Sequence, residues 1–349
     1  AWFEFNSQLG ALLNLDVVQL PVYSWGCAIG HAIRMAARIT GRAKVLVPAL
    51  SDPERLSVIR TYCQPAGMEG HIEVVTVAAD PTSGQLDQSD LAAKLGDEVA
   101  AVYFENPAYL GTIETGAAEI ARMASAAGAE TIVGVDPASL GVLKAPGDYG
   151  ADIVTGPVQP LGVHMHCGGG AGGFIASRDE ERYVRAYNGF LVSVVETLEP
   201  GQLGFGLACP HQNSYGMREN GNDWTGNSTY LWAIAGAVYM SLLGPEGFRE
   251  LGRLIVSRAR YAASLLAGIG GVRIVWPDTT FKEFVVNFDD TGKTVAQIND
   301  ALRAQGIFGG KDLSQENREL GQSALYCVTE VHSAADIRRL AETLKEVLS

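Results

Sequence analysis

The chain has 349 residues, of which 47% are hydrophobic and 19% are charged. This length and composition suit one large or two medium-sized domains with a sizeable core. The formal net charge of −13 argues against nucleic-acid binding. No apolar run approaches the length of a membrane span, which argues against a membrane protein.

The cysteines and the start of the chain bear on where the protein resides. The five cysteines are scattered, odd in number and without CxxC spacing, which is typical of reduced thiols in a cytoplasmic protein. No signal peptide precedes the first amphipathic pattern, which ends at Leu13. Because the chain begins at Ala1 and not at Met, we expect further residues upstream.

Helical and strand patterns alternate through the first half of the chain. Ser51-Asp52-Pro53-Glu54 reads as a capping box that opens a helix reaching Cys63. This βαβα rhythm predicts a mostly parallel sheet covered on both faces. The expected strands are 43–48, 71–78, 99–104 and 131–135, and the expected helices are 30–42, 51–63, 89–95 and 115–127.

The second half departs from this rhythm. We expect strands at 153–155 and 173–176, a loop-rich region at 201–229, and a helix at 230–243 that stops at Gly244-Pro245. A helix at about 248–266 then leads into a smaller domain. The smaller domain shows strand patterns at 272–276, 284–288 and 324–328, and helices at 295–304 and from 334. We therefore predict a large domain over 1–245 and a small C-terminal domain over 246–349.

The most informative stretch runs from Gly147 to Phe174 and reads as a strand, a turn and a glycine-rich return. Enzymes that use pyridoxal phosphate (PLP) carry their Schiff-base lysine in such a stretch. Here the expected register holds Gln159, and no lysine occurs between Lys144 and Lys282. Because a glutamine amide cannot form an imine, we predict that this chain does not hold PLP covalently at this position.

Three other positions would suit the same kind of site. Asp136 ends a buried strand, where an Asp can pair with the pyridinium nitrogen of PLP or simply cap the next turn. Asn106, before Pro107, can contact the cofactor ring or simply start a turn. The backbone at Trp25-Gly26 opens a helix whose N–H groups can hold a phosphate, and the alternative is a tight loop with a buried Trp.

Other motifs carry less chemistry. The stretch from Gly168 to Gly173 satisfies GxGxxG, but it leads into a strand instead of opening a helix, so a dinucleotide site is not expected. His164 and His166 share a strand face without further ligands nearby, which favours a structural role over a metal site. We expect no metal, and no nucleophile elbow, P-loop or HExxH motif is present.

Taken together, the segments resemble the α chain (subunit 1) of the two-subunit glycine dehydrogenase (decarboxylating), the P-protein of the glycine cleavage system. The resemblance covers nearly the whole chain. Its most telling part is Gln159-Pro160-Leu161-Gly162. The other matching segments are 105–111, 135–141, 150–154, 239–247, 283–286, 309–310 and 327–330.

This resemblance implies the aspartate-aminotransferase-like fold, PLP-dependent transferase fold type I, with a large, mixed but mostly parallel sheet and a small C-terminal α/β domain. In that family the α chain lacks the lysine, and a sister β chain carries it together with PLP. The two form an α₂β₂ heterotetramer, a cytoplasmic oxidoreductase that decarboxylates glycine and passes an aminomethyl group to a lipoyl carrier. This chain alone is then expected to be inactive.

Three departures from the family pattern leave alternatives open. The usual Arg-rich stretch before the helix at about 229 is replaced by a loop with Arg218 as its only strong cation. Asp52-Pro53 stands where His-Pro is usual, and the family's N-terminal extension is absent from this sequence. The alternatives are a diverged complex that acts on another small amine or amino acid, and a non-catalytic scaffold.

The rewritten loop from Cys209 to Thr229 is crowded with polar and aromatic residues that suit close contacts on an irregular backbone. We predict that it approaches the cofactor pocket of the partner, with Arg218 clamping a substrate carboxylate. A solvated surface loop is the alternative. The residues expected to reach the partner's site are His211, Asn213, Tyr215, Arg218 and Asn222.

Overall fold

The computed structural model describes residues 1–63, 70–164, 172–209, 214–222 and 229–349. Two compact units emerge from the packing of the chain. The first unit comprises residues 1–78, 86–106 and 115–248, and the second comprises 79–85, 107–114 and 249–349. The second unit thus includes two short segments from the first half of the chain. The division between 245 and 246 stays a prediction.

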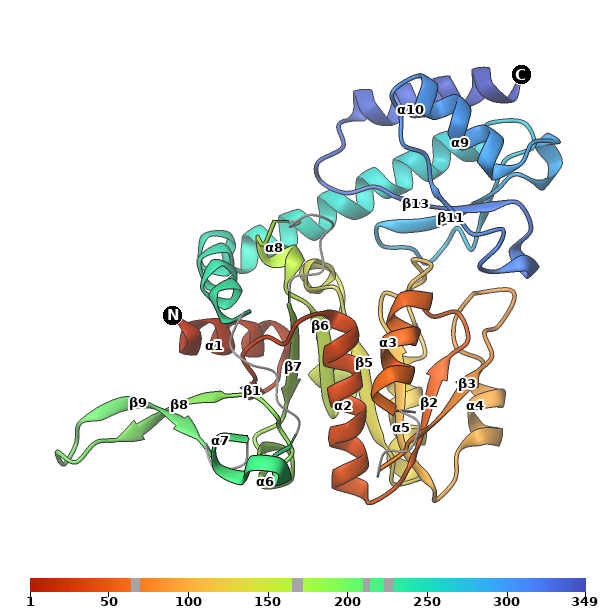
Figure 1. Cartoon of the computed structure of the whole chain (residues 1–349). Coiled ribbons are helices and arrows are strands. Elements are labelled where there is room, and N and C mark those ends of the chain that lie inside the picture. Colours follow the sequence, from red (N-terminus) through yellow and green to blue (C-terminus); the bar gives the residue numbers. More distant parts are fainter. Residues whose placement is uncertain (64–69, 165–171, 210–213, 223–228) are drawn as a thin grey trace. The chain divides into compact units, whose positions relative to one another are not determined.

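The first unit is built on a seven-stranded sheet with the order β1-β7-β6-β5-β4-β2-β3 (Figure 1). Strands β3, β2, β4, β5 and β6 are parallel, and β7 and β1 are antiparallel to their neighbours. The predicted mostly parallel sheet is therefore confirmed. The strands are β1 (Val17–Val18), β2 (Lys44–Pro48), β3 (Glu73–Val77), β4 (Val99–Glu105), β5 (Glu130–Gly134), β6 (Ile153–Pro157) and β7 (Gly173–Ser177).

Helices cover both faces of this sheet. Strand β4 shows why: Val102 and Phe104 point into one apolar core, while Ala101 and Tyr103 point into the other. One core includes α1, and the other lies beneath α2 and α3. The helices of this unit that precede its loop region are α1 (Trp2–Leu13), α2 (Trp25–Thr40), α3 (Pro53–Cys63), α4 (Gln88–Lys94), α5 (Ala117–Ala126) and α6 (Glu181–Val184).

Two helix starts differ from the sequence expectation. Helix α2 begins at Trp25, five residues before the expected start, because the Ser24 hydroxyl accepts a hydrogen bond from the backbone N–H of Cys27. The cap of α3 is Asp52, whose carboxylate accepts hydrogen bonds from the N–H groups of Glu54 and Arg55. Ser51 instead donates to the carbonyl of Pro48, so the predicted capping box is wrong.

The region expected to be loop-rich contains a strand. Strands β8 (Leu191–Glu196) and β9 (Leu203–Ala208) form a two-stranded antiparallel hairpin, which projects away from the seven-stranded sheet in Figure 1. Its pattern was missed because Gly204 and Gly206 interrupt the apolar run of β9. The short helix α7 (Ser214–Met217) follows.

Helix α8 (Tyr230–Ala267) runs from the first unit into the second. It is two helices joined at a kink, because Gly244 adopts φ 58° and ψ −177°, which is not helical, and Pro245 follows. The predicted stop at Gly244-Pro245 is confirmed. No helix in the described part of the chain is long and apolar enough to cross a membrane.

The second unit has its own four-stranded antiparallel sheet with the order β10-β11-β13-β12. Helices α9 and α10 contribute to its separate apolar core, and both begin with capping boxes, at Thr294 and Ser333. The elements are β10 (Arg273–Val275), β11 (Glu283–Asn287), α9 (Val295–Ala304), β12 (Lys311–Asp312), β13 (Ser323–Cys327) and α10 (Ala334–Leu348). The short strand β12 was not expected from the sequence.

Candidate functional site

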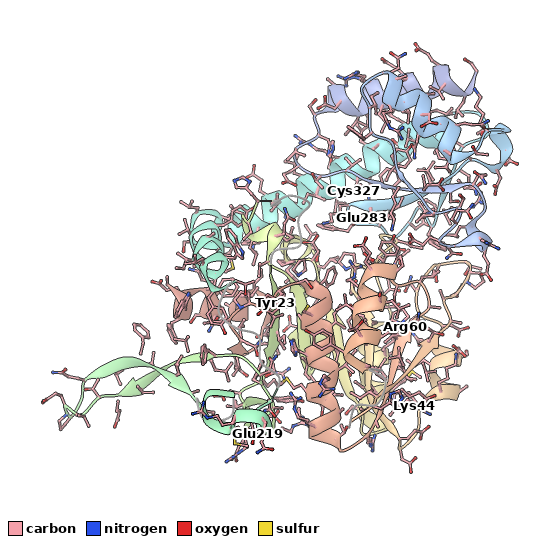
Figure 2. All side chains as sticks on the ribbon, viewed as in Figure 1. Tyr23, Lys44, Arg60, Glu219, Glu283 and Cys327 are labelled. Atoms are coloured by element: carbon pink, nitrogen blue, oxygen red, sulfur yellow. The ribbon has the colours of Figure 1, made fainter. Side chains whose placement is uncertain are left out.

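The residues expected to form a site gather at the carboxyl edge of the parallel strands in the first unit. Asn106 follows β4, Asp136 follows β5 and Gln159 follows β6. Helix α2 also starts at this edge, preceded by the half-exposed Tyr23, whereas Lys44 at the start of β2 marks the opposite edge (Figure 2). Open α/β sheets bind ligands at the carboxyl edge, so a ligand site is expected at this edge.

Gln159 begins a 3₁₀ turn over Gln159–Leu161, directly after β6. Its side chain is half-buried, and its backbone carbonyl accepts a hydrogen bond from the N–H of Val163 at 3.2 Å. The side-chain amide offers no nucleophilic amine. The residues present at this position therefore do not fit covalently bound PLP.

Asp136 is buried at the end of β5. Its carboxylate accepts a hydrogen bond of 2.9 Å from the backbone N–H of Ala138 and so caps the 3₁₀ turn over Pro137–Gly141. The Ser139 hydroxyl donates to the Asp136 carbonyl at 2.7 Å. The carboxylate thus makes the capping contact that we gave as its alternative role, and a role toward a cofactor stays a prediction.

Asn106 is buried beside the same strand ends. Its backbone N–H donates to the carbonyl of Gly134 at 2.8 Å, which ties the end of β4 to β5. Burial raises the pKa of Tyr149, and a hydrogen bond between the side chains of Tyr149 and Asn106 partly opposes this effect. Asn106 therefore lies in a polar contact within the edge of the sheet.

Trp25 and Gly26 form the first turn of α2. Gly26 packs closely on Val58 of α3, where an added Cβ would lie 3.1 Å from the Val58 Cβ. The Trp25 indole N–H donates to the Thr155 hydroxyl of β6 at 3.4 Å. The half-buried Trp25 side chain thus connects the start of α2 to β6 near the carboxyl edge of the sheet.

An ion pair that we did not predict lies at the same edge. The Arg55 guanidinium of α3 donates from Nε and Nη2 to both carboxylate oxygens of Glu105, each at 2.9 Å. Glu105 is the last residue of β4, and its side chain is only 4% exposed. Asp52 makes a second ion pair with Arg55 at 3.0 Å. The only sequence signal was an Asp three residues before an Arg, which is common at helix starts.

The environment of this ion pair keeps Arg55 charged. Burial by itself would lower the pKa of Arg55, but the neighbouring carboxylates of Glu105 and Asp52 more than offset it, so the pKa lies above its usual range. Tyr103 donates to Glu105 at 2.7 Å, and burial followed by the Glu105 charge raises the pKa of Tyr103. Arg55 therefore stays charged beside Glu105.

Gly134 makes room for these side chains. A Cβ at this position would lie 2.7 Å from the Tyr103 hydroxyl oxygen, 3.0 Å from Cγ of Glu105 and 3.1 Å from Cζ2 of Trp25. Three side chains from different elements therefore meet on the bare backbone of β5. Any larger residue at Gly134 would displace them.

The residues predicted to reach a partner's site are only partly described. His211 and Asn213 lie outside the described residues, as does the side chain of Tyr215. Asn222 donates to the backbone carbonyls of Arg185 and Tyr187 and so anchors the loop to its own unit. Arg218 is exposed and adopts a positive φ of 56°.

The remaining motifs can be placed only in part. His164 is exposed after β6, whereas His166 and Gly168–Gly170 lie outside the described residues. Among the residues that the structure describes, no group of three His, Cys, Asp or Glu side chains could hold a metal ion.

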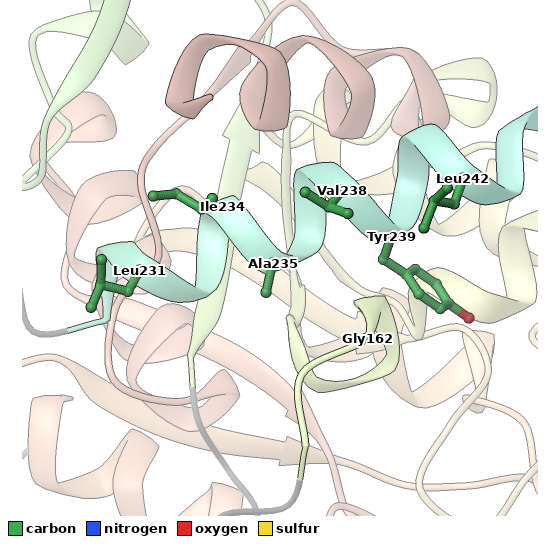
Figure 3. A pocket seen from close by; sticks show the side chains of 7 residues that line it. All are labelled: Gly162, Leu231, Ile234, Ala235, Val238, Tyr239 and Leu242. Atoms are coloured by element: carbon green, nitrogen blue, oxygen red, sulfur yellow. The ribbon is translucent and has the colours of Figure 1, made fainter.

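The first half of α8 carries an apolar groove of about 540 Å³. Leu231, Ile234, Val238 and Leu242 recur at helical spacing along it, and Gly162 lies opposite Ala235 and Tyr239 of the same helix (Figure 3). Leu242 is 80% exposed. This exposed stripe is unusual for the surface of a lone protein.

Solved structures of low sequence identity share the fold of this chain. It is similar to a sphingosine-1-phosphate lyase of Burkholderia pseudomallei, with a TM-score of 0.72 and 15% identity over 99% of this chain and 77% of that one. It is also similar to a NifS-like protein, with a TM-score of 0.68 and 13% identity over 99% and 87%. The chain thus has PLP-dependent transferase fold type I.

The family is shown more closely by sequence. The model of the glycine cleavage system P-protein matches residues 1–344. Probable glycine dehydrogenase (decarboxylating) subunit 1 is 34% identical in Staphylothermus marinus and 36% identical in Saccharolobus islandicus, over all of this chain and 74% of each relative. A crystal structure of an inhibitor-bound glycine decarboxylase (P-protein) has a TM-score of 0.89 and 34% identity over 99% of this chain and 75% of that one. The chain belongs to the glycine cleavage system P-protein family.

Proposed function

We propose that this chain is the lysine-lacking subunit of a heteromeric, PLP-dependent glycine decarboxylase. In this assembly a sister subunit carries the lysine and the PLP, and the complex releases CO₂ from glycine and passes an aminomethyl group to a lipoyl carrier. The observation that carries the proposal is Gln159, which stands after β6 in a chain of the P-protein family. When bound in the partner, PLP supplies the electron sink that decarboxylation needs.

Exposed apolar surface supports the proposal that a partner subunit binds this chain. The α8 groove is one such surface, and the hairpin is another, since Leu203 and Phe205 of β9 are 69% and 73% exposed. A two-stranded hairpin is marginally stable by itself in water. Both surfaces gain stability if a second subunit covers them.

Arg218 has a proposed role in binding substrate in the partner's site. It is the only Lys or Arg between Cys209 and Thr229, and a guanidinium can hold a carboxylate by two hydrogen bonds. Replacing Arg218 with Ala in the reconstituted complex should raise KM for the substrate and leave assembly intact. The control is Arg338→Ala, which removes an exposed arginine of α10 in the second unit. Unchanged KM in Arg218→Ala would leave the loop a structural element.

The direct test is reconstitution with a lysine-bearing P-protein subunit from the same genome, assayed by exchange of labelled bicarbonate into the glycine carboxyl group. Exchange by the pair, and none by either chain alone, is the expected result. A complex that forms but is inactive on glycine favours the alternative of another small amine or amino acid, which the rewritten loop around Arg218 suggests. The absence of any lysine-bearing sister gene would favour a scaffold.

A further inference from the structure

The Trp25 ring is held on three sides at the carboxyl edge of the sheet. The guanidinium carbon of Arg55 lies 4.2 Å from the centroid of the ring, which is the geometry of a cation–π contact. The indole N–H donates to Thr155 of β6, and the ring edge packs on Gly134 of β5. The ring therefore covers the ends of β5 and β6.

Arg55 is itself fixed in place. Two hydrogen bonds to Glu105 and an ion pair with Asp52 hold its guanidinium over the ring, and its side chain is only 18% exposed. A bidentate pair of this kind has a defined geometry as well as a favourable energy. Moving Trp25 would require breaking contacts to α3, β5 and β6 together.

This cluster lies where a ligand of this fold would bind. The sheet order places β2 between β3 and β4, so the direction of winding changes between β2 and β4. The crevice at such a switch point is the usual ligand site of an open α/β sheet. Arg55 follows β2 and Glu105 ends β4, so their ion pair spans the crevice. The strand ends under Trp25 are those that lead to Asp136 and Gln159.

We infer that Trp25 and the Arg55–Glu105 pair fill the pocket in which a fold type I enzyme holds PLP, and that this chain is closed to the cofactor even where a lysine is available. The loss of the lysine and the filling of the pocket are then two separate barriers. This inference rests on the proposed function only for the class of cofactor. It predicts that restoring the lysine alone does not restore PLP binding.

The test restores the lysine with and without the ring, using PLP as the probe. Gln159→Lys and Gln159→Lys/Trp25→Ala are incubated with PLP, reduced with borohydride and mapped by mass spectrometry. Gln159→Lys should trap no more PLP at residue 159 than the unaltered chain does. The double variant should trap at least about tenfold more, because the ring that fills the pocket is gone. Stoichiometric trapping by Gln159→Lys alone overturns the inference.

The matched control is Gln159→Lys/Trp232→Ala, which removes an equal ring from α8 in the same unit and should behave like Gln159→Lys. If Gln159→Lys/Trp25→Ala traps no more PLP than Gln159→Lys while keeping its circular dichroism and melting temperature, the inference is wrong. If that variant does not fold, equilibrium dialysis of PLP against Gln159→Lys decides: retained PLP overturns the inference, and its exclusion supports it. Glycine exchange by the unaltered complex is measured separately, so an open pocket in an active complex contradicts this inference and leaves the proposed function standing.

Discussion

At the scale of single residues, Arg55 and Glu105 form a buried pair in which each charge depends on the other. Removing one partner of such a pair leaves an uncompensated charge and costs about 3–5 kcal/mol. We therefore expect Arg55→Leu to lower the free energy of unfolding by about 3 kcal/mol, measured by urea denaturation. The double change Arg55→Leu/Glu105→Leu should recover much of the loss, because no charge is left buried.

The control for this prediction is the exposed pair of Arg122 and Glu119 on α5, in which the side chains are 67% and 44% exposed. Arg122→Leu should change the free energy of unfolding much less than Arg55→Leu does, because solvent screens the exposed pair. A loss in Arg55→Leu no larger than that in Arg122→Leu would contradict the structural role of the buried pair.

Glu130 lies at the amino edge of the parallel strands and allows a test of how stability depends on pH. It is buried at the start of β5 and accepts hydrogen bonds from Arg182 and the Tyr183 hydroxyl, each at 2.6 Å. Burial raises the pKa of Glu130 above 4.5, and the hydrogen bond from Tyr183 only partly opposes this effect. As pH rises, the Glu130 carboxyl therefore loses its proton in the unfolded chain before it does so in the folded chain. The stability that Glu130 contributes is full below its unfolded pKa and declines as pH rises through the folded pKa.

We expect the free energy of unfolding of the unaltered chain, relative to Glu130→Gln, to fall as pH rises above the unfolded pKa of 4.5 and through the raised folded pKa. Urea denaturation at a series of pH values measures this difference. Glu119→Gln is the control of opposite sign, because the hydrogen bond from Arg122 lowers the pKa of Glu119. A difference for Glu130 that rises with pH would show that its pKa is lowered instead.

Single residues also show which features of the candidate site can be predicted from the sequence. Gln159 was predictable because one residue type, lysine, is required for an imine, and its absence is visible in any register. The contact between Arg55 and Trp25 was not predictable, because it joins residues 30 positions apart on two helices that the sheet brings together. The position of Asp136 could be predicted from the sequence, but its role could not, since capping and cofactor binding both require a carboxylate at a strand end.

At the scale of elements, the kink in α8 depends on one glycine. Gly244 adopts φ 58° and ψ −177°, a combination that is almost restricted to glycine. Gly244→Ala should destabilise the protein by about 1–3 kcal/mol in thermal or urea unfolding. Gly270→Ala is the control, since a Cβ there meets nothing within 4 Å. Equal effects of the two changes would mean that the kink does not require glycine.

The hairpin and the α8 groove test assembly. Phe205→Ser and Leu242→Ser each remove an exposed apolar side chain, and we expect each to weaken binding of the sister subunit by about tenfold or more. Sedimentation or light scattering of the mixed subunits measures the dissociation constant. Phe308→Ser is the control, because Phe308 is 89% exposed but belongs to the second unit. Unchanged affinity in both variants would place the partner elsewhere.

Elements were predictable where hydrophobic period and turn residues agreed. The buried strands β2, β4 and β5 read as short apolar runs, and Gly244-Pro245 marked the break in α8. Strand β9 failed this test because its Leu-Gly-Phe-Gly-Leu pattern combines a strand period with glycines that favour turns. The apolar side chains of β9 are exposed in this chain, so β9 lacks the alternation of buried apolar and exposed polar residues that marks a half-buried strand.

At the scale of the whole molecule, the chain has the fold of the P-protein family, PLP-dependent transferase fold type I, and carries Gln159 in the turn after β6. Fold type I could be predicted because ordered matches extend along nearly the whole sequence. The two units were harder to predict from the sequence, since residues 79–85 and 107–114 join the second unit through contacts with distant residues. One example is the hydrogen bond from the Trp276 indole to the carbonyl of Pro81.

The proposed function assigns the cofactor to the partner and not to this chain. The most direct measurement is borohydride reduction of the reconstituted, glycine-active complex, followed by peptide mapping of both subunits for PLP-modified lysine. We expect the modification on the sister subunit alone, with none on this chain. Modification of Lys144, Lys282 or any other lysine of this chain would contradict it.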